Sequence, residues 1–584
     1  EYCHYTLARF INNSIPQASE FCLKLAVLVN IEINRGNVCL EVDAIQQKSH
    51  ELGWSRLSSD EIEKQLAASP ISGTEADNRP LILFQHKLYL NRYYHNEKSI
   101  ADSLLAMASR TDAVTAADRQ TIESLFKSGA EIDYQKLAAL ICARHRLSII
   151  SGGPGTGKTW TVSRILAVLL QRNPHLNIRL AAPTGKAAAR LSESINKLRS
   201  TLSLDASLLE LIPQQAVTLH RLLGFHRYTH RPRYHRNNPL RCDVLVLDEA
   251  SMIDQQMMAA ICAALADDCK LILLGDKDQL SSVEAGSVFA DLSGGLQQSE
   301  FNPPQQQWIQ QQLGYQLPLQ QTGYALADQL VVLQQSHRFD DASAIGMLAR
   351  SVNRGDSGQA LQLLRQATQN DAIDWQQPPS HSLNQRYREQ AERYYLAQAQ
   401  AGSIEQAFQQ FHRFQILAAV WSGPSGVDHI NAIIEAHLKS KLGQPENTLY
   451  YAGMPLMMSS NLYQYQIHNG DIGIVWPDEQ GQHKVWFEQA DAAFRILSLS
   501  QLPAHKTAYA MTVHKSQGSE FSRVLLMLPE TQTAVATREL LYTGITRAAE
   551  SVEIWATEGQ LKTVIENKTK RMSGLRERLA LVER

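Results

Sequence analysis

The sequence predicts an α/β protein built around a parallel sheet, and three observations carry this prediction. The apolar pair Ile149-Ile150 leads into a glycine-rich turn at 151–159. Further apolar runs at 178–182, 244–247 and 271–274 each end in polar residues. Helical patterns separate these runs, as expected of buried parallel strands joined by helices. Because ligands gather at the carboxyl ends of such strands, we expect the functional residues there.

The composition is that of an ordinary globular protein, and the length of 584 residues is too great for a single core. We expect about three or four domains from the length alone. The net charge of −2 excludes a generally basic surface. Any nucleic-acid site must therefore be a local groove of lysines and arginines.

The cysteines and the apolar runs indicate a cytoplasmic protein. The seven cysteines are scattered and contain no C-x-x-C pair, which favours reduced core thiols over disulfides or a metal cluster. The longest apolar stretch near the start, 25–29, is far too short to span a membrane, so we expect no membrane contact. The chain begins with Glu1 rather than Met, and we expect further residues before it.

The glycine-rich turn matches the phosphate-binding pattern G-x-x-x-x-G-K-[ST]. Its glycines let backbone N–H groups point at phosphate oxygens, Lys158 can reach the β- and γ-phosphates, and the Thr159 hydroxyl can bind Mg²⁺. These features predict ATP and Mg²⁺ as ligands. The residues expected to hold the nucleotide here are Gly152, Gly153, Pro154, Gly155, Thr156, Gly157, Lys158 and Thr159.

Other strand ends supply candidate chemistry. Asp248 and Glu249 follow the run 244–247, so that Asp248 can hold Mg²⁺ while Glu249 polarises the attacking water. Gln279 follows the next run and is placed to sense the γ-phosphate. Gln135 precedes the first strand, and its amide suits the edge of adenine, although a solvated glutamine on a helix face is the alternative.

Two loops between strand-like and helix-like segments have the composition of phosphate-gripping loops. Residues 182–190 and 218–224 are rich in small side chains and hydrogen-bond donors. We expect Pro183, Thr184, Thr218 and His220 to contact DNA. The region before them, 1–108, shows helical patterns and one strand-like hairpin at 81–90, and it contains no catalytic constellation.

The ordered set of Gln135, the phosphate loop, the loops at 182–190 and 218–224, Asp248-Glu249-Ala250-Ser251 and the stretch 275–280 resembles superfamily 1 DNA helicases. It is more similar still to the RecD family, the alpha subunits of the RecBCD enzyme (exodeoxyribonuclease V). The resemblance implies two RecA-like P-loop motor domains, at 109–342 and 343–584. It also implies a partner-binding, mainly helical N-terminal domain at 1–108 and a small SH3-like β insertion at about 445–505.

The resemblance assigns roles to residues of the second motor domain. Arg338 resembles the family's arginine that faces the γ-phosphate, although an arginine at a helix end on the surface is the alternative. Arg547 resembles the arginine finger. Around the motif at 508–521, Thr512 and His514 would touch the DNA strand, while Gln517, Gly518 and Glu520 would approach the nucleotide.

The function implied is that of an ATP-dependent 5′→3′ DNA helicase, working with RecB-like and RecC-like subunits on double-strand ends for recombination and repair. No nuclease constellation is visible in the sequence. Two alternatives remain open: a stand-alone 5′→3′ DNA helicase, and a scaffold subunit whose nucleotide site is only a conformational switch. Tyr463 and Tyr465 are candidate base-stacking platforms, although a structural role in the core or on the surface is the stronger interpretation.

Overall fold

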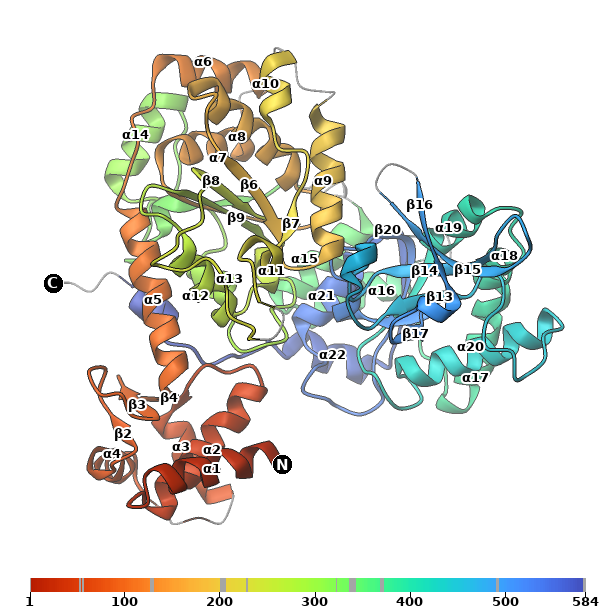
Figure 1. The fold of residues 1–584 in the computed structure, drawn as a ribbon, viewed down its shortest axis with the longest axis horizontal. Coiled ribbons are helices and arrows are strands. Elements are labelled where there is room, and N and C mark those ends of the chain that lie inside the picture. The colour runs from red at the N-terminus through yellow and green to blue at the C-terminus, as the bar shows by residue number, and fades with distance from the viewer. Residues whose placement is uncertain are drawn as a thin grey trace.

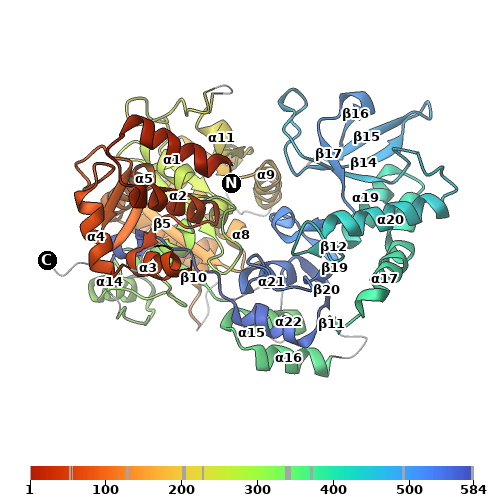
Figure 2. The same ribbon diagram turned by 90° about the horizontal axis from the view of Figure 1, so that it is seen from below.

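The structure is a computed structural model that describes residues 2–51, 54, 57–126, 131–199, 206–226, 229–321, 323–335, 343–367, 372–489 and 493–580. We call residues 109–335 the first lobe, 343–566 the second lobe and 567–580 the C-terminal segment. Figure 1 shows the N-terminal unit below the first lobe, with the second lobe beside it. Figure 2 shows the same two lobes facing each other across α9 and α21.

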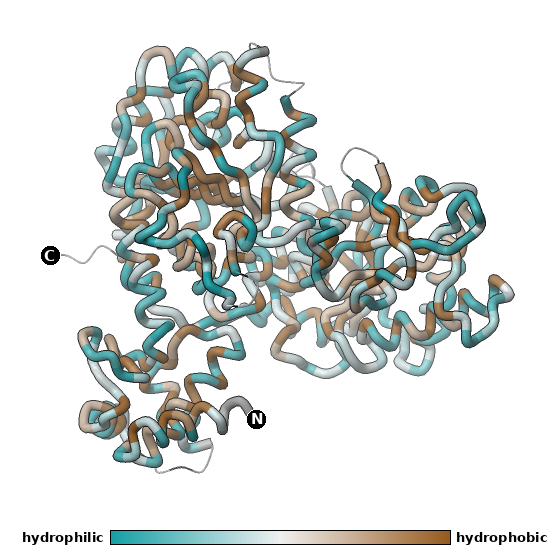
Figure 3. The backbone as a smooth tube through the Cα atoms, in the orientation of Figure 1, coloured by the Kyte–Doolittle hydropathy of each residue, from teal (hydrophilic) through white to brown (hydrophobic). Residues whose placement is uncertain are grey.

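The first lobe is built on a six-stranded parallel sheet in the order β10-β5-β9-β8-β6-β7. Its strands are β5 (Leu147–Gly152), β6 (Ile178–Ala182), β7 (Val217–Thr218), β8 (Val244–Leu247), β9 (Lys270–Gly275) and β10 (Leu330–Leu333). Alternate residues of β8 and β9 enter separate cores on the two faces of the sheet. β8 and β9 are therefore buried on both sides, and the centre of the lobe appears apolar (Figure 3).

Helices cover both faces of this sheet. They are α6 (Ala116–Leu125), α7 (Tyr134–Arg144), α8 (Lys158–Arg172), α9 (Gly185–Arg199), α10 (Ala206–Leu211), α11 (Leu219–Leu222), α12 (Gln255–Ala264), α13 (Val288–Leu292) and α14 (Pro303–Leu313). One face packs on α7, α8 and α9 and the other on α12 and α13. The runs predicted as strands at 178–182, 244–247 and 271–274 are confirmed as β6, β8 and β9.

The second lobe contains a five-stranded parallel sheet in the order β11-β20-β19-β12-β18. Its strands are β11 (Ile373–Gln376), β12 (Phe414–Ala418), β18 (Ala510–Thr512), β19 (Phe521–Met527) and β20 (Ala548–Trp555). Its helices are α15 (Ala344–Arg354), α16 (Ser357–Gln366), α17 (Leu383–Gln390), α18 (Leu396–Ala399), α19 (Ile404–Arg413), α20 (Val427–Lys441), α21 (Arg538–Ile545) and α22 (Glu558–Glu566). Two parallel α/β lobes therefore confirm the predicted fold class.

A separate five-stranded antiparallel sheet is inserted between α20 and β18, in the order β16-β15-β14-β13-β17. Its strands are β13 (Pro455–Met458), β14 (Ile472–Pro477), β15 (His483–Glu488), β16 (Phe494–Ser498) and β17 (His505–Thr507). Val485 and Leu497 bury one face of this sheet in the core of the second lobe. The insertion therefore packs against the lobe that carries it.

The N-terminal unit combines helices with a small sheet. Its elements are α1 (Tyr2–Ser14), α2 (Glu20–Asn34), α3 (Val42–Glu51), α4 (Ser59–Ala68) and α5 (Asn91–Ala108), with β1 (Leu40–Glu41), β2 (Ser72–Gly73), β3 (Leu81–Phe84) and β4 (Lys87–Leu90). The predicted hairpin is confirmed, and its turn residues Gln85 and His86 have φ of 47° and 59°. The second half of α5, with Leu104, enters the core of the first lobe. That helix therefore ties the unit to the motor.

The C-terminal segment leaves the second lobe and returns to the N-terminal unit, ending in α23 (Leu575–Arg578). The Met572 carbonyl accepts a hydrogen bond from Val38 N–H at 2.8 Å. Glu97 of α5 is fully buried and accepts hydrogen bonds from Arg578 Nε at 2.9 Å and Tyr89 Oη at 3.1 Å. The ion pair between Glu97 and Arg578 thus joins the N-terminal unit to the C-terminal segment.

The sequence suggests that the glutamine-rich stretch 305–321 is a mobile surface insertion, and this interpretation is wrong for its first half. Residues 303–313 form α14, in which Ile309 is fully buried and Gln305 Nε2 lies 3.1 Å from His145 Nε2. The Arg144 guanidinium lies over the Trp308 ring at 4.1 Å.

Among the described helices, none is both long and apolar enough to cross a membrane.

Candidate nucleotide site between the two lobes

The glycine-rich loop lies between the end of β5 and the start of α8. Gly155 and Gly157 both have φ of 77°, a conformation that other residues adopt only with strain. A Cβ on Gly152 would lie 2.5 Å from Thr156 Oγ1, so the loop also requires glycine there. Lys158 Nζ donates hydrogen bonds to the Gly152 carbonyl at 2.6 Å and the Gly153 carbonyl at 3.2 Å. The ammonium group is thereby held over the loop, where phosphate oxygens would lie.

Carboxylates from the two neighbouring strands gather beside this loop. Asp248 follows β8, and its pKa is raised to about 6 by burial and by the charge of Glu249, with Lys158 opposing the shift. Asp276 follows β9, and burial together with Asp278 raises its pKa to about 6. Glu249 N–H donates to Asp248 Oδ1 at 2.9 Å. Clustered buried carboxylates of this kind favour a bound cation.

The donor set fits a magnesium–nucleotide complex. Thr159 lies in the first turn of α8, beside Lys158, and Asp248 is at the end of β8, next but one to β5 in the sheet. The described residues contain no group of three or more His, Cys, Asp or Glu side chains able to enclose a metal by themselves. Mg²⁺ held by one or two protein oxygens, with phosphates and water completing its shell, suits this arrangement.

The second lobe reaches across to the loop through α21. Tyr542 Oη donates a hydrogen bond to Asp276 Oδ2 at 3.1 Å, and a Cβ on Gly153 would lie 2.9 Å from the same hydroxyl. Leu280 N–H donates to Thr543 Oγ1 at 3.0 Å. The structure therefore shows the lobes in contact at the nucleotide loop itself.

The residues predicted to approach the nucleotide from the second lobe lie at this same interface. Gln517 Nε2 donates to the Leu280 carbonyl at 2.9 Å. Glu520 forms an ion pair with Arg190 of α9 at 2.6 Å, and Arg190 Nη1 also donates to the Gly518 carbonyl at 3.3 Å. Gln517, Gly518 and Glu520 thus contact the first lobe, and their contact with a nucleotide stays a prediction.

Arg547 follows α21 and faces the acidic cluster of the first lobe. Only 4% of its surface is exposed. Its guanidinium donates to the Ser519 carbonyl at 3.1 Å and the Thr543 carbonyl at 3.3 Å. Burial lowers its pKa, and the charge of Glu249 is the largest influence in the opposite direction. The guanidinium is therefore held by its own lobe, close enough to Glu249 for the two charges to interact.

Three other predicted residues have different outcomes. Gln135 Nε2 donates to the Thr156 carbonyl at 2.9 Å, so this glutamine lies against the phosphate loop. Gln279 Nε2 donates to Asp276 Oδ2 at 3.1 Å. Arg338 lies outside the described residues.

The loops predicted to contact DNA follow β6, β7 and β18 and belong to both lobes. β6 and β7 are adjacent, so Pro183 and Thr184 lie near Thr218 and His220. Thr184, Thr218 and Thr512 each accept a hydrogen bond from a backbone N–H three residues later, at 3.2, 3.4 and 3.3 Å. These bonds fix the loops. His514 lies in the short helical turn after Thr512, and burial lowers its pKa.

Family models match one segment in each of the three parts of the chain. The N-terminal domain of RecBCD enzyme subunit RecD matches residues 3–89, an AAA domain matches 135–285, and the UvrD-like helicase C-terminal domain matches 507–554. RecBCD enzyme subunit RecD of Mycolicibacterium smegmatis is 35% identical over 580 residues, which cover 97% of this chain and 94% of that protein. The chain belongs to the RecD family. The family's subunit from Haemophilus influenzae is 33% identical, over 98% of this chain and 94% of that protein.

Other proteins are more distantly similar to this chain. The ATP-dependent RecD2 DNA helicase of Deinococcus radiodurans is 27% identical and covers 86% of this chain, but only 58% of that protein is matched. Among solved structures, the Pif1 helicase of Candida albicans has a TM-score of 0.39 and 14% identity, covering 74% of this chain and 97% of that chain.

Sequence reasoning missed several residues that the structure brings to the site. From the sequence alone, no role is assigned to Tyr542, and none is assigned to Asp276 within the stretch 275–280. Arg190 was assigned only to a DNA loop. Each contact joins residues more than 200 positions apart, between lobes. A buried tyrosine hydroxyl needs a polar partner, but the burial of Tyr542 becomes visible only in the structure.

Proposed function

We propose that this chain is an ATP-dependent 5′→3′ DNA helicase and the motor subunit of a RecBCD-like machine that processes double-strand DNA ends for recombination and repair. One observation carries the proposal. Arg547 of the second lobe is buried within electrostatic reach of Glu249 of the first, at the boundary where Tyr542 contacts the end of β9 beside the phosphate loop. An ATPase whose catalytic groups come from two lobes can convert hydrolysis into relative movement of those lobes.

Each residue has a distinct role in this proposal. Lys158 neutralises the β- and γ-phosphates, and Thr159 with Asp248 holds Mg²⁺. When bound, Mg²⁺ would neutralise charge on the transferred phosphoryl group. Glu249 orients the attacking water and accepts its proton. Arg547 stabilises the charge of the transition state, with Arg338 as a second cation. Gln279 senses whether the γ-phosphate is present, and Gln135 binds adenine.

The DNA strand would cross both lobes. Pro183, Thr184, Thr218 and His220 would hold it on the first lobe, and Thr512 and His514 on the second. Two close approaches support a continuous track: a Cβ on Gly518 would lie 3.8 Å from Ala187 Cβ, and Gly185 packs against the His468 ring of the insertion. The polarity rests on the resemblance of the inserted sheet to that of 5′→3′ helicases.

RecB-like and RecC-like subunits are the proposed partners, with the N-terminal unit as the partner-binding domain. The support is the match of residues 3–89 to the RecD N-terminal domain and the relatives' description as RecBCD enzyme subunits. Strand cutting is assigned to another subunit of the complex. We place the protein in the cytoplasm, since the six cysteines with described side chains are buried and unbridged.

Lys158→Gln tests the motor assignment. The substitution removes the cation over the phosphate loop, and we expect DNA-stimulated ATP hydrolysis and unwinding by this chain to be lost. Lys197→Gln, on the exposed face of α9, removes the same charge away from the site and should leave both activities unchanged. Normal unwinding by Lys158→Gln would refute the assignment.

Two further measurements distinguish the alternatives. An active monomer that gains nothing from RecB-like and RecC-like chains would favour a stand-alone helicase, the class represented by the RecD2 match. Tight ATP binding without DNA-stimulated turnover would favour a nucleotide-switched scaffold. Our proposal predicts DNA-stimulated turnover together with co-purification of the partner chains.

A further inference from the structure

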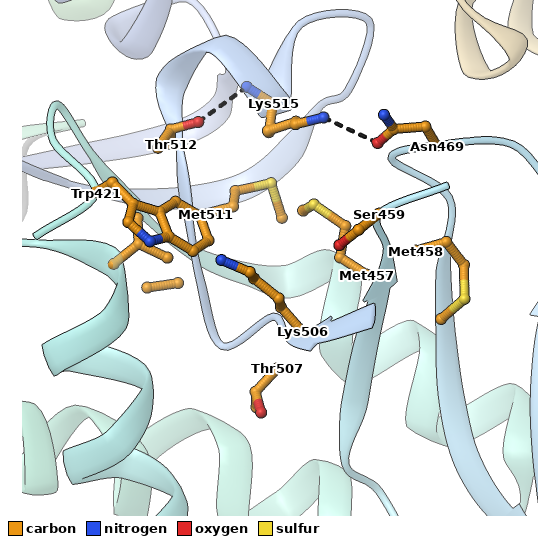
Figure 4. A pocket seen from close by; sticks show the side chains of 12 residues that line it. Trp421, Met457, Met458, Ser459, Asn469, Lys506, Thr507, Met511, Thr512 and Lys515 are labelled. Carbon is orange, nitrogen blue, oxygen red and sulfur yellow. Dashed lines mark hydrogen bonds between the residues drawn. The ribbon is translucent and has the colours of Figure 1, made fainter. Parts of the chain in front are cut away.

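A hollow of about 360 Å³ lies in the second lobe between the parallel sheet and the inserted sheet. Its volume falls within the range of about 300–1,000 Å³ that is typical of ligand sites. Figure 4 shows Trp421 on one side, with Met457 and Met511 lining the space beside it. Trp421 follows β12, and 36% of its surface is exposed, unusually much for an indole beside apolar side chains.

Two lysines give the hollow positive charge. Lys506 Nζ lies over the Trp421 ring, 3.8 Å from its centroid. Lys515 Nζ donates to Asn469 Oδ1 at 3.0 Å on the opposite side (Figure 4). Both lysine side chains are exposed. Glu435, a carboxylate near the hollow, forms an ion pair with Lys439 at 2.8 Å. Because its charge is already paired, it does not cancel the positive charge of Lys506 and Lys515.

The hollow adjoins the proposed DNA track. Thr512 and Lys515 line it, and both belong to the stretch proposed to hold the strand on the second lobe. His468, the neighbour of Asn469, packs against Gly185 at the start of α9 in the first lobe. A strand that passes from the 183–185 loop to Thr512 therefore passes the opening of the hollow.

We propose that this hollow binds a nucleobase of single-stranded DNA, with Trp421 as the stacking platform and Lys506 and Lys515 as contacts to the adjacent phosphates. The inference rests on the proposed function and adds a binding subsite to it. The indole is 36% exposed and can be reached from solvent, although the Lys506 ammonium lies over its face in this structure. A base takes the place of that ammonium, and the lysine moves to the backbone phosphate.

The chemistry predicts binding without sequence preference. Every base has a flat face that can stack on an indole, and lysines contact phosphates regardless of sequence. Ser459 and Asn469 are polar residues that also line the hollow. Both are exposed to solvent, so they are not buried groups that would select one base. This suits a motor that must step along any strand, and it gives the second lobe a grip on a base as well as on the backbone.

Tyr465, a candidate platform in the sequence, is less suited to this role. Its hydroxyl accepts a hydrogen bond from Gln501 Nε2 at 3.0 Å and its carbonyl accepts one from Arg495 at 2.5 Å, so it is held within the inserted sheet. The side chain of Tyr463 lies outside the described residues. Trp421, in contrast, lines the hollow beside Thr512 and Lys515.

Trp421→Ala in the full chain tests the proposal, with affinity for a fluorescent oligothymidylate as the measurement. Loss of one stacked base should weaken binding about tenfold, which corresponds to about 1.4 kcal/mol. Trp421→Phe keeps a stacking face and should stay within about threefold of wild type. Trp54→Ala is a matched control, because Trp54 also lies under a lysine, Lys24 at 5.9 Å, but belongs to the N-terminal unit.

An abasic oligonucleotide tests the same idea in the unaltered protein. We expect it to bind the wild type about as weakly as oligothymidylate binds Trp421→Ala, and to be insensitive to that substitution. Lys506→Ala should reduce the slope of log affinity against log salt by about one. Melting temperatures and ATP affinity measured for each variant identify any that is misfolded.

The outcomes separate this inference from the proposed function. If the wild type shows no DNA-stimulated ATP hydrolysis, the proposed function fails. If it does, but Trp421→Ala and the abasic strand bind like their controls, the subsite is refuted while the motor stands. Unchanged oligonucleotide binding together with weaker assembly with partner chains would make the hollow a protein contact and would likewise overturn the proposal.

Discussion

The hydrogen bond between Tyr542 and Asp276 joins the two lobes at the phosphate loop, and Tyr542→Phe removes it without changing the shape of the side chain. Both partners are buried, and the distance is 3.1 Å. Hydrogen bonds to charged groups contribute about 1.5–3 kcal/mol. Because Gln279 still donates to the same carboxylate oxygen, we expect the lower end of that range.

The expected consequence is a tenfold shift, since about 1.4 kcal/mol corresponds to a factor of ten. If closing over ATP uses this contact, the ATP concentration that half-saturates the DNA-stimulated ATPase should rise about tenfold. The assay is steady-state ATP hydrolysis at saturating single-stranded DNA, with ATP varied.

Tyr451→Phe is the matched control. Tyr451 is also buried, and its hydroxyl lies 2.6 Å from that of Tyr509, but both belong to the second lobe. We expect this variant to lose stability without any change in ATP dependence. A Tyr542→Phe enzyme with unaltered ATP dependence, or a Tyr451→Phe enzyme with the same shift, would refute the reasoning.

Three further substitutions probe other parts of the molecule. Arg547→Ala should lower DNA-stimulated ATP turnover by about 10³-fold or more at unchanged ATP affinity. Arg523→Ala, on the exposed face of β19, is the control and should leave turnover unchanged. Equal rates for the two variants in a phosphate-release assay would contradict the role of Arg547 in stabilising the transition state. Glu97→Ala leaves the Arg578 charge buried and unpaired and should cost about 3–5 kcal/mol in urea unfolding, so an unchanged midpoint would argue against the buried pair. The pKa of Asp276 is raised to about 6, above its ordinary value, so its contribution to the stability of the nucleotide-free protein is present below about pH 4 and is lost as the pH rises through 6. Asp276→Asn should therefore flatten the fall in melting temperature between pH 5 and pH 7, and an undiminished fall would show that other groups cause it.

The elements that the sequence predicted well are those whose signal is local. The strands β8 and β9 are apolar runs because they are buried on both faces, and the two apolar strands of the hairpin β3–β4 are separated by the polar turn Gln85-His86. The phosphate loop is specified by glycines at positions of positive φ. In contrast β11 was missed, because only Ile373 of its four residues is buried and the strand lies at the sheet edge.

Contacts between distant segments leave no such signal. Nothing in the residues around Met572 indicates that the C-terminal segment crosses back to Val38, and the bond from Tyr542 to Asp276 spans two lobes. The glutamines of α14 resemble low-complexity sequence, but Gln305 is buried against His145 because helical spacing places it beside Ile309 on the inner face. Trp421 was overlooked because its neighbours in the hollow come from β13, β17 and β18.

The central claim is that ATP bound between the two lobes drives movement along one DNA strand. Displacement of streptavidin from end-biotinylated single strands measures that movement directly. We predict ATP-dependent displacement from the 3′ end and not from the 5′ end, lost in both Lys158→Gln and Arg547→Ala. Displacement from the 5′ end alone would contradict the polarity, and ATP hydrolysis stimulated by DNA without displacement from either end would contradict the motor itself.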